Sequence, residues 1–231
     1  MSQKRKKQFD ERHQKIIKVA EQLLLDSAVY DLTLDNLAEQ LDLAKGTLYK
    51  HFASKDELLL SVLIEYEKKA LQPTLITDGA SASVVRVMLF YLNFPQHAVM
   101  MANLEERLSA TVVGFNRLFD ELYATRHQGA ENLLGIATRY LHDQNSTLDP
   151  VEYLSTVFAM IHGGAMLLNS SFYQRFVGER ESLKWSLVHQ ALILPQLYRN
   201  DNLPQIDDVA LPDTDPNAPP KLIKPLVPPV V

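Results

Sequence analysis

The chain has 231 residues, of which 46% are hydrophobic and 22% charged, so it can bury a sizeable core and is neither disordered nor membrane-embedded. It contains no cysteine, which excludes disulfide bonds, thiolate metal sites, iron–sulfur clusters and cysteine nucleophiles. The net charge of −5 excludes a protein that coats nucleic acid along its whole length, because such a protein is basic throughout.

The basic side chains are concentrated at the N-terminus. Residues 1–20 hold seven basic and two acidic side chains, and residues 4–7 are a continuous basic run. We interpret residues 1–9 as a basic arm, which is either a solvated terminus or a contact for an anionic partner. The first helix is predicted at residues 10–27, where apolar side chains recur at helical spacing.

A second and a third helix are predicted close together. Thr33 is a suitable N-cap for the second, because its hydroxyl can accept from an otherwise unpaired amide. An apolar stripe at i, i+3, i+4 and i+7 follows it (Leu34, Leu37, Ala38, Leu41). Asp42 then predicts a tight turn, since a short polar side chain tolerates left-handed backbone geometry. The third helix is predicted at residues 44–52, with Leu48 and Phe52 facing inward.

The remaining elements are also predicted as helices. Ser54 and Glu57 have the spacing of a capping box, which predicts a fourth helix that ends near Leu71. Further helices are predicted at residues 83–94, 95–110, 111–143, 150–176 and 179–198. No strand pattern appears, so we expect an all-α fold of about nine helices, in which a three-helix helix-turn-helix domain precedes a larger helical domain. The longest strongly apolar run, residues 157–168, is too short to span a bilayer.

The composition changes after residue 200. Eight of the twelve prolines fall within residues 204–231, where they are mixed with aspartates. We expect residues 201–231 to be an extended acidic tail, which is either a docking peptide or dispensable. The predicted domains are therefore 1–70 and 71–200, followed by this tail.

The segment at residues 33–58 carries the most functional information. Two short helices joined by a tight turn predict a helix-turn-helix, whose second helix enters the major groove of DNA. No acidic residue occupies its expected exposed positions, which are Lys45, Gly46, Thr47, Tyr49, Lys50 and His51. Gly46 allows a close approach of backbone to DNA, and Lys55 places a positive charge in the first turn of the next helix. Lys50 is equally consistent with a base contact and with a solvated surface.

In this segment the sequence resembles the TetR family of bacterial transcriptional regulators. The resemblance covers roughly residues 10–70 and rests on Thr33, Leu37-Ala38, Leu43, residues 45–52, Lys55 and Leu58. It implies that Lys45, Gly46 and Thr47 face base edges, that Thr33, Tyr49, His51 and Lys55 bind phosphates, and that the basic arm reaches a minor groove. The chain departs from the family at Ala44, where many members carry Ser or Thr, and at Asp42, where glycine is common.

Two roles are predicted for residues 71–200, namely ligand binding and dimerisation. Aromatic and methionine side chains form adaptable apolar walls. The candidate ligand contacts are Phe94, Met101, Leu104, Phe119, Tyr123, His162 and Met166, most of which are equally typical of an ordinary core. A ridge of small residues recurs every four positions (Ser155, Ala159, Gly163), and a second stripe lies in the last helix (Leu187, Ala191, Leu194). In the family these two helices form the dimer interface, and a monomer core is the alternative interpretation.

An enzyme is not expected. The sequence contains no HExxH, Walker or GxSxG motif, and we predict no cofactor and no metal site. The resemblance implies a cytoplasmic repressor that binds a palindromic operator in double-stranded DNA as a homodimer. The aromatic and methionine candidates predict that a small, largely apolar organic effector releases it, and no membrane partner is expected. The alternatives are a ligand-independent activator or architectural DNA-binding protein, and an all-α carrier or enzyme for apolar ligands.

Overall fold

The computed structural model describes residues 3–26, 32–111, 114, 116–176 and 178–199. These residues form helices and connecting loops, and no strand occurs among them, which confirms the all-α prediction. The α-helices are α1 (Gln3–Asp26), α2 (Leu34–Gln40), α3 (Lys45–Leu48), α4 (Lys55–Leu71), α5 (Ala80–Leu92), α6 (Pro95–Thr111), α7 (Asn116–Asp143), α8 (Pro150–Asn169), α9 (Ser171–Phe176) and α10 (Arg180–Leu197). A 3₁₀ helix, η1 (Gln72–Leu75), follows α4. The predicted tail at 201–231 lies outside the described residues.

The helix signals at 33–57 act as predicted. The Thr33 hydroxyl accepts a hydrogen bond from the Asn36 amide at 3.1 Å, and the Ser54 hydroxyl accepts one from the Glu57 amide at 3.1 Å. The Glu57 carboxylate accepts from the Ala53 amide at 2.6 Å, so it reaches one residue before the N-cap itself. Asp42 adopts a φ of 51°, which is the left-handed turn geometry predicted for it. Glycine is more common at this position.

The first helix and the helix predicted at 150–176 differ from their predicted limits. The first begins at Gln3, so the basic run at 4–7 is helical and does not form a separate extended arm. Lysine, arginine and glutamine favour helix, and no breaker separates the run from residue 10. The helix predicted at 150–176 divides into α8 and α9 at Ser170, which has an extended backbone (ψ 120°).

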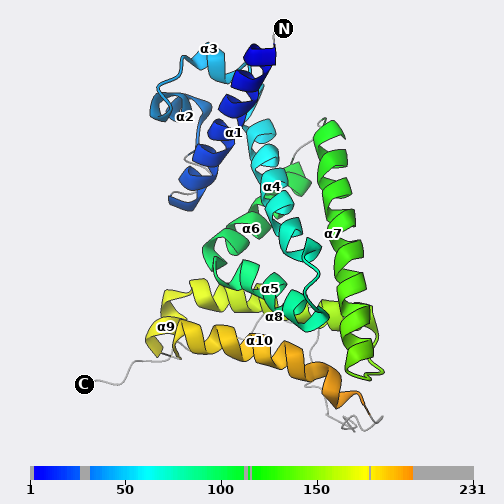
Figure 1. The fold of residues 1–231 in the computed structure, drawn as a ribbon. Coiled ribbons are helices and arrows are strands. Elements are labelled where there is room, and N and C mark those ends of the chain that lie inside the picture. Colours follow the sequence, from blue (N-terminus) through cyan, green and yellow to red (C-terminus); the bar gives the residue numbers. More distant parts are fainter. Residues whose placement is uncertain (1–2, 27–31, 112–113, 115, 177, 200–231) are drawn as a thin grey trace, which may run out of the picture.

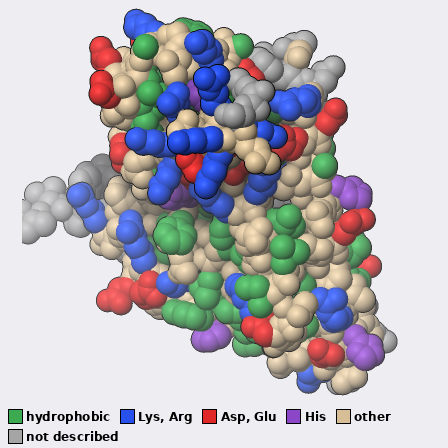
Figure 2. Space-filling model, turned by 45° about the horizontal axis from the view of Figure 1, so that its top comes forward, with side chains coloured by type: hydrophobic (Ala, Val, Ile, Leu, Met, Phe, Trp, Pro, Cys, Tyr) green, Lys and Arg blue, Asp and Glu red, His purple; other side chains and the backbone are tan. Residues whose placement is uncertain are grey.

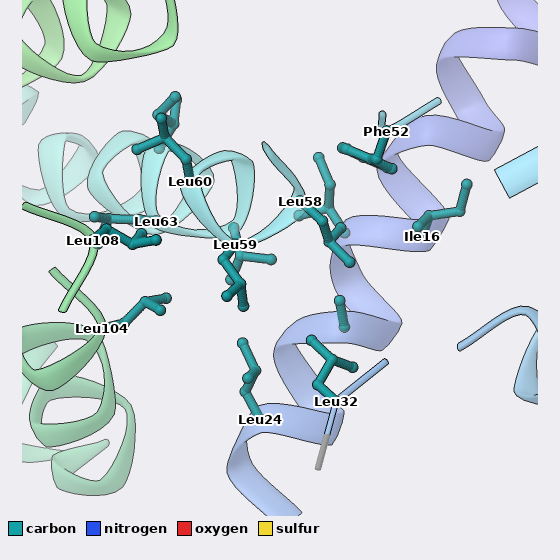
Figure 3. Close-up of a cluster of buried hydrophobic side chains, with 14 of the residues drawn as sticks. Ile16, Leu24, Leu32, Phe52, Leu58, Leu59, Leu60, Leu63, Leu104 and Leu108 are labelled. Carbon is teal, nitrogen blue, oxygen red and sulfur yellow. The ribbon is translucent and has the colours of Figure 1, made fainter. Parts of the chain in front are cut away.

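The N-terminal helices share one hydrophobic core with the body of the protein. Figure 1 shows α1–α3 at one end of the molecule and α4 running from them into the larger helical body, beside α7. Figure 3 shows Leu58 next to Ile16 of α1, while Leu59 and Leu63, further along α4, approach Leu104 and Leu108 of α6. The predicted boundary at residue 70 therefore does not separate two cores, because α4 is buried against both sides.

A second core lies between α5, α7, α8 and α10. Two buried tyrosines of this core donate hydrogen bonds to backbone carbonyls of α10: Tyr140 to Leu192 at 2.8 Å and Tyr153 to Ala191 at 3.1 Å. Helix α8 also approaches α10 closely at Gly164, where an added Cβ would lie 2.4 Å from a methyl carbon of Leu187. These contacts fix the orientation of α8 against α10.

Helix α8 is longer than the apolar run that the sequence analysis considered. It has 20 residues, and its most apolar stretch of 18 residues has a mean hydropathy of 1.3, which by length and composition alone is sufficient to cross a membrane. In the structure one face of α8 packs into the second core through Tyr153, Val157, Ile161 and Leu168. Such packing is typical of the central helix of a helical protein.

Candidate nucleic-acid interface and ligand chamber

The predicted DNA-reading surface lies at the end of the molecule formed by α2 and α3. Lys45, Gly46, Tyr49 and Lys50 are exposed, and the aromatic side chain of Tyr49 is 52% accessible. Thr33 is exposed as well, although its hydroxyl already caps α2. Figure 2 shows Lys and Arg side chains gathered over this end, whereas hydrophobic patches lie on the body below. The arrangement gathers hydrogen-bond donors and positive charge on one surface.

Helix α3 contains only four residues, fewer than the predicted segment at 44–52. Ala44 precedes it and has no side chain that can cap the helix, as its replacement of Ser or Thr implied. After Leu48 the amides of Lys50 and His51 bond to carbonyls three residues earlier, which tightens the chain into a turn. Thr47 and Lys55 are half-buried beside this turn.

Lys45 is paired with an acidic residue of the preceding helix. Its Nζ lies 2.7 Å from Oδ2 of Asp35, and this hydrogen bond raises the pKa of the Lys45 ammonium. The sequence analysis did not identify Asp35, because a single acid in an exposed helix is usually only solvated. The signal that it carried was its position in the first turn of the second helix, ten residues before Lys45.

His51 does not fit the phosphate-binding role predicted for it, because the tight turn after Leu48 directs its ring inward. It is only 8% exposed and stacks on Phe9 with the ring centroids 4.0 Å apart. Together with His13 and Phe52 these rings form what we call the aromatic cluster. Burial lowers the pKa of His51, and the neighbouring His13 and Arg12 lower it further.

A cavity of about 480 Å³, here called the chamber, lies between α4, α6, α7 and α8. Three of the predicted ligand contacts line it, namely Met101, His162 and Met166. The His162 ring donates from Nδ1 to the Phe158 carbonyl at 2.9 Å, since a carbonyl can only accept. The other lining residues include Tyr66, Ala70, Leu71, Tyr91, Val99, Leu133, Leu154, Phe158, Ile161 and Ala165.

The four other predicted ligand contacts lie elsewhere. Leu104 is 1% exposed and belongs to the core shared by α4 and α6, and Phe119 packs against the same core. Phe94 and Tyr123 are exposed on the surface. Helical spacing places such residues on an apolar face, but it does not distinguish a cavity wall from solid core.

One part of the chamber wall carries charge. Arg126 of α7 donates to both carboxylate oxygens of Glu105 on α6, with an Nη2–Oε2 distance of 2.7 Å, and its Nη2 lies 2.8 Å from Oε1 of Glu67 on α4. We call these three residues the charged end of the chamber. Burial disfavours the charge on Arg126, but the hydrogen bonds to Glu105 and Glu67 outweigh burial and raise the pKa of the guanidinium. The sequence analysis missed this cluster because its members are 21 and 59 residues apart.

Comparison with known proteins identifies the N-terminal part. Residues 16–62, which include α2, the turn and α3, match the family model described as bacterial regulatory proteins, tetR family. Residues 16–62 are therefore a TetR-family domain. No curated protein sequence matches the chain.

Solved structures resemble this chain in fold over about four fifths of its length, at low identity. A TetR/AcrR-family regulator from Thermobifida fusca is 16% identical with a TM-score of 0.54, and the match covers 79% of this chain and 97% of that one. A TetR-family regulator from Streptomyces coelicolor is 19% identical with a TM-score of 0.56, over 81% and 82%. The ketosteroid transcriptional regulator KstR2 of Mycobacterium tuberculosis is 14% identical with a TM-score of 0.52, over 78% and 93%.

The predicted dimer residues divide into two groups. The α8 ridge of Ser155, Ala159 and Gly163 is exposed along its length. Ala191 of α10 is fully buried within the chain, and Leu187 and Leu194 are half-buried against the second core, so this stripe packs on α8 of the same subunit. The large apolar residues Trp185, Ile193 and Leu197 of α10 are exposed. They lie on a different face of the helix from the predicted stripe.

Among the described residues, no three His, Asp or Glu side chains gather in a way that could hold a metal ion. The two features with a shape suited to binding are therefore the surface of α2 and α3 and the chamber. Helix α4 connects them, because its first turns pack under the reading surface and its last turns line the chamber.

Proposed function

We propose that the protein is a transcriptional repressor that binds a palindromic operator in double-stranded DNA as a homodimer. The observation that carries this proposal is the exposed set Lys45, Gly46, Tyr49 and Lys50, which lies within the segment that matches the TetR family. We expect Lys45, Gly46 and Thr47 to face base edges, and Thr33, Tyr49 and Lys55 to contact phosphates. We expect the protein to act in the cytoplasm, where its DNA is.

Dimerisation is the second part of the proposal. A palindromic site requires two reading surfaces related by a two-fold axis. The α8 ridge supports it, because small exposed residues allow a partner helix to approach closely. Trp185, Ile193 and Leu197 of α10 are also exposed, and they replace the buried Ala191 in our assignment of the interface.

Release by an effector is the third part of the proposal. A ligand in the chamber contacts Tyr66, Glu67, Ala70 and Leu71, which belong to the helix that supports the reading surface. A ligand that binds more tightly when α4 is in one position than in another shifts the protein toward the first position. A difference of a few kcal/mol is enough to change the fraction of protein that binds DNA. A small, largely apolar organic molecule suits the predominantly apolar lining.

Selection from random duplexes followed by fluorescence anisotropy tests the DNA-binding proposal. The wild-type protein should enrich a palindrome and bind it with an affinity that falls steeply as salt rises. We expect Lys55→Ala and Tyr49→Ala each to weaken binding about tenfold, and Lys55→Ala to lower the salt slope by about 1. Arg139→Ala, which removes an exposed charge from α7, is the matched control and should bind like the wild type. Unchanged binding by both of the first variants would contradict the proposed surface.

A further inference from the structure

The charged end of the chamber has a formal charge of −1, since one guanidinium faces two carboxylates. It borders a wall that is otherwise mostly apolar or aromatic, apart from a few polar groups such as His162 and Asn103. Charges at the edge of such a cavity interact strongly with a ligand, because few water molecules remain to screen them once the cavity is filled. The sign of this cluster therefore bears on which ligands the chamber accepts.

Three ligand classes meet this cluster differently. An anion has to displace a carboxylate from Arg126 and then faces the remaining negative charge. A neutral apolar molecule removes water from the charged side chains and offers them no hydrogen bond or ion pair in exchange, which is unfavourable for ionised groups. A cation is attracted by the excess carboxylate and leaves the existing ion pairs in place. The charge balance thus favours a positively charged ligand.

Glu67 is the carboxylate with capacity for a further partner. Both carboxylate oxygens of Glu105 accept hydrogen bonds from Arg126, whereas only Oε1 of Glu67 does so. The Glu67 side chain is 19% exposed. The rings of Tyr66, Tyr91 and Phe158 line the same chamber, and aromatic faces attract organic cations. Burial raises the pKa of the Tyr66 and Tyr91 hydroxyls, so both rings stay neutral and keep this property.

We propose that the chamber takes an amphipathic organic cation, whose apolar body packs against α7 and α8 while its positive group lies against Glu67. The inference rests on the proposed function for its regulatory meaning, since it specifies the class of effector for the same chamber. It also places the positive group of the ligand directly on α4, the helix that supports the reading surface.

Two matched pairs of probes test the charge preference by titration calorimetry. Phenyltrimethylammonium and tert-butylbenzene have nearly the same shape and differ by one positive charge. Tetraphenylphosphonium and tetraphenylborate are a larger pair of opposite charge. We expect each cation to bind the wild-type protein at least tenfold more tightly than its partner. In Glu67→Gln we expect cation affinity to fall at least tenfold and the affinities of the other two probes to stay or rise.

Two further variants separate the charge of Glu67 from its packing. Glu67→Asp keeps a carboxylate and should retain a preference for the cations. Glu121→Gln removes a carboxylate that pairs with Lys68 of α4 at 2.9 Å, outside the chamber lining, and should bind all four probes like the wild type. Circular dichroism checks that each variant is folded, and the retained affinity of Glu67→Gln for tert-butylbenzene gives a second check of an intact chamber.

The outcomes distinguish this inference from the function on which it rests. Binding of tetraphenylborate as tight as that of tetraphenylphosphonium, unchanged cation affinity in Glu67→Gln, or no binding of either cation would overturn the inference. If the same preparation still binds its selected duplex, the regulator proposal survives that failure. If the cations bind as expected while no duplex is bound in any selection, the function fails and the ligand class stands.

Discussion

Lys45 Nζ lies 2.7 Å from Asp35 Oδ2, so the first side chain of α3 is bonded across the turn to α2. Both side chains are more than half exposed, and a surface ion pair of this kind contributes little to stability. Its consequence concerns DNA binding, because Lys45 has to leave or share this carboxylate in order to reach a base edge.

Asp35→Asn should therefore strengthen DNA binding. The substitution removes a negative charge beside the reading surface and frees the Lys45 ammonium. We expect an affinity increase of roughly three- to tenfold at low salt, shrinking as salt screens the charge. Anisotropy titrations at two salt concentrations measure it. Asp143→Asn, an equal change of charge at the far end of α7, is the control, and weaker binding by Asp35→Asn would show that the pair positions Lys45 for recognition.

Gly163→Arg should convert the protein to a monomer. An added Cβ at Gly163 meets no atom within 4 Å in the same chain, so the substitution is expected to leave the subunit folded. A long charged side chain on the α8 ridge prevents close approach of a partner helix. Analytical ultracentrifugation should show the loss of dimer, and affinity for a full palindrome should fall about a hundredfold. Gln128→Arg, exposed on α7, should remain dimeric.

Gly164→Ala should destabilise the subunit itself. The new Cβ would lie 2.4 Å from one methyl carbon of Leu187 and 3.1 Å from a methyl carbon of Leu92, so both side chains have to move. Overpacking of this kind costs about 1–3 kcal/mol in the free energy of unfolding, which urea denaturation measures. Gly135→Ala is the comparison, because its Cβ meets only the flexible end of Arg139 at 3.4 Å. It should be neutral or stabilising by up to about 1 kcal/mol.

The aromatic cluster should make stability depend on pH. Burial lowers the pKa of His13, an effect that Glu57, Glu65 and Asp10 partly offset, and burial also lowers that of His51. Nδ1 of each ring is buried and has no hydrogen-bond partner among the described residues.

Because these pKa values are below the unfolded value of 6.5, the unfolded chain binds more protons as pH falls past 6.5. The free energy of unfolding should therefore fall between pH 7.5 and 5.5, and the decrease should end once the folded rings also protonate. The double variant His13→Phe, His51→Phe removes both groups and should flatten this slope in urea denaturation. His142→Phe, exposed on α7, is the control, and an unchanged slope in the double variant would contradict the assignment.

The parts of the fold that sequence could predict are those with local causes. Thr33, Ser54 and Asp42 act within three or four residues of their own position, so helix starts and the turn followed directly from them. The start of α1 was missed because basic character suggested an arm, whereas the helix propensity of the same residues determined the structure. The inward position of His51 depends on where α3 ends, and boundaries of short helices are poorly determined by pattern.

The site residues that sequence missed are those with distant partners. Arg126 joins Glu67 and Glu105 from three helices, and nothing in the local pattern around any of them indicates the others. Leu104 and Met101 illustrate a related difficulty, because both are buried in α6 at helical spacing. Only Met101 lines the chamber, and the difference arises from how α6 is placed against α7 and α8.

The burial of α4 on both sides also determines how the molecule can be divided. A fragment cut after residue 70 would leave the leucines at 59 and 63 without the α6 side chains that cover them, notably Leu104 and Leu108. Such a fragment would expose an apolar strip along its last helix and tend to aggregate. An isolated fragment that contains the DNA-reading end therefore has to include α6, or carry polar residues in place of those leucines.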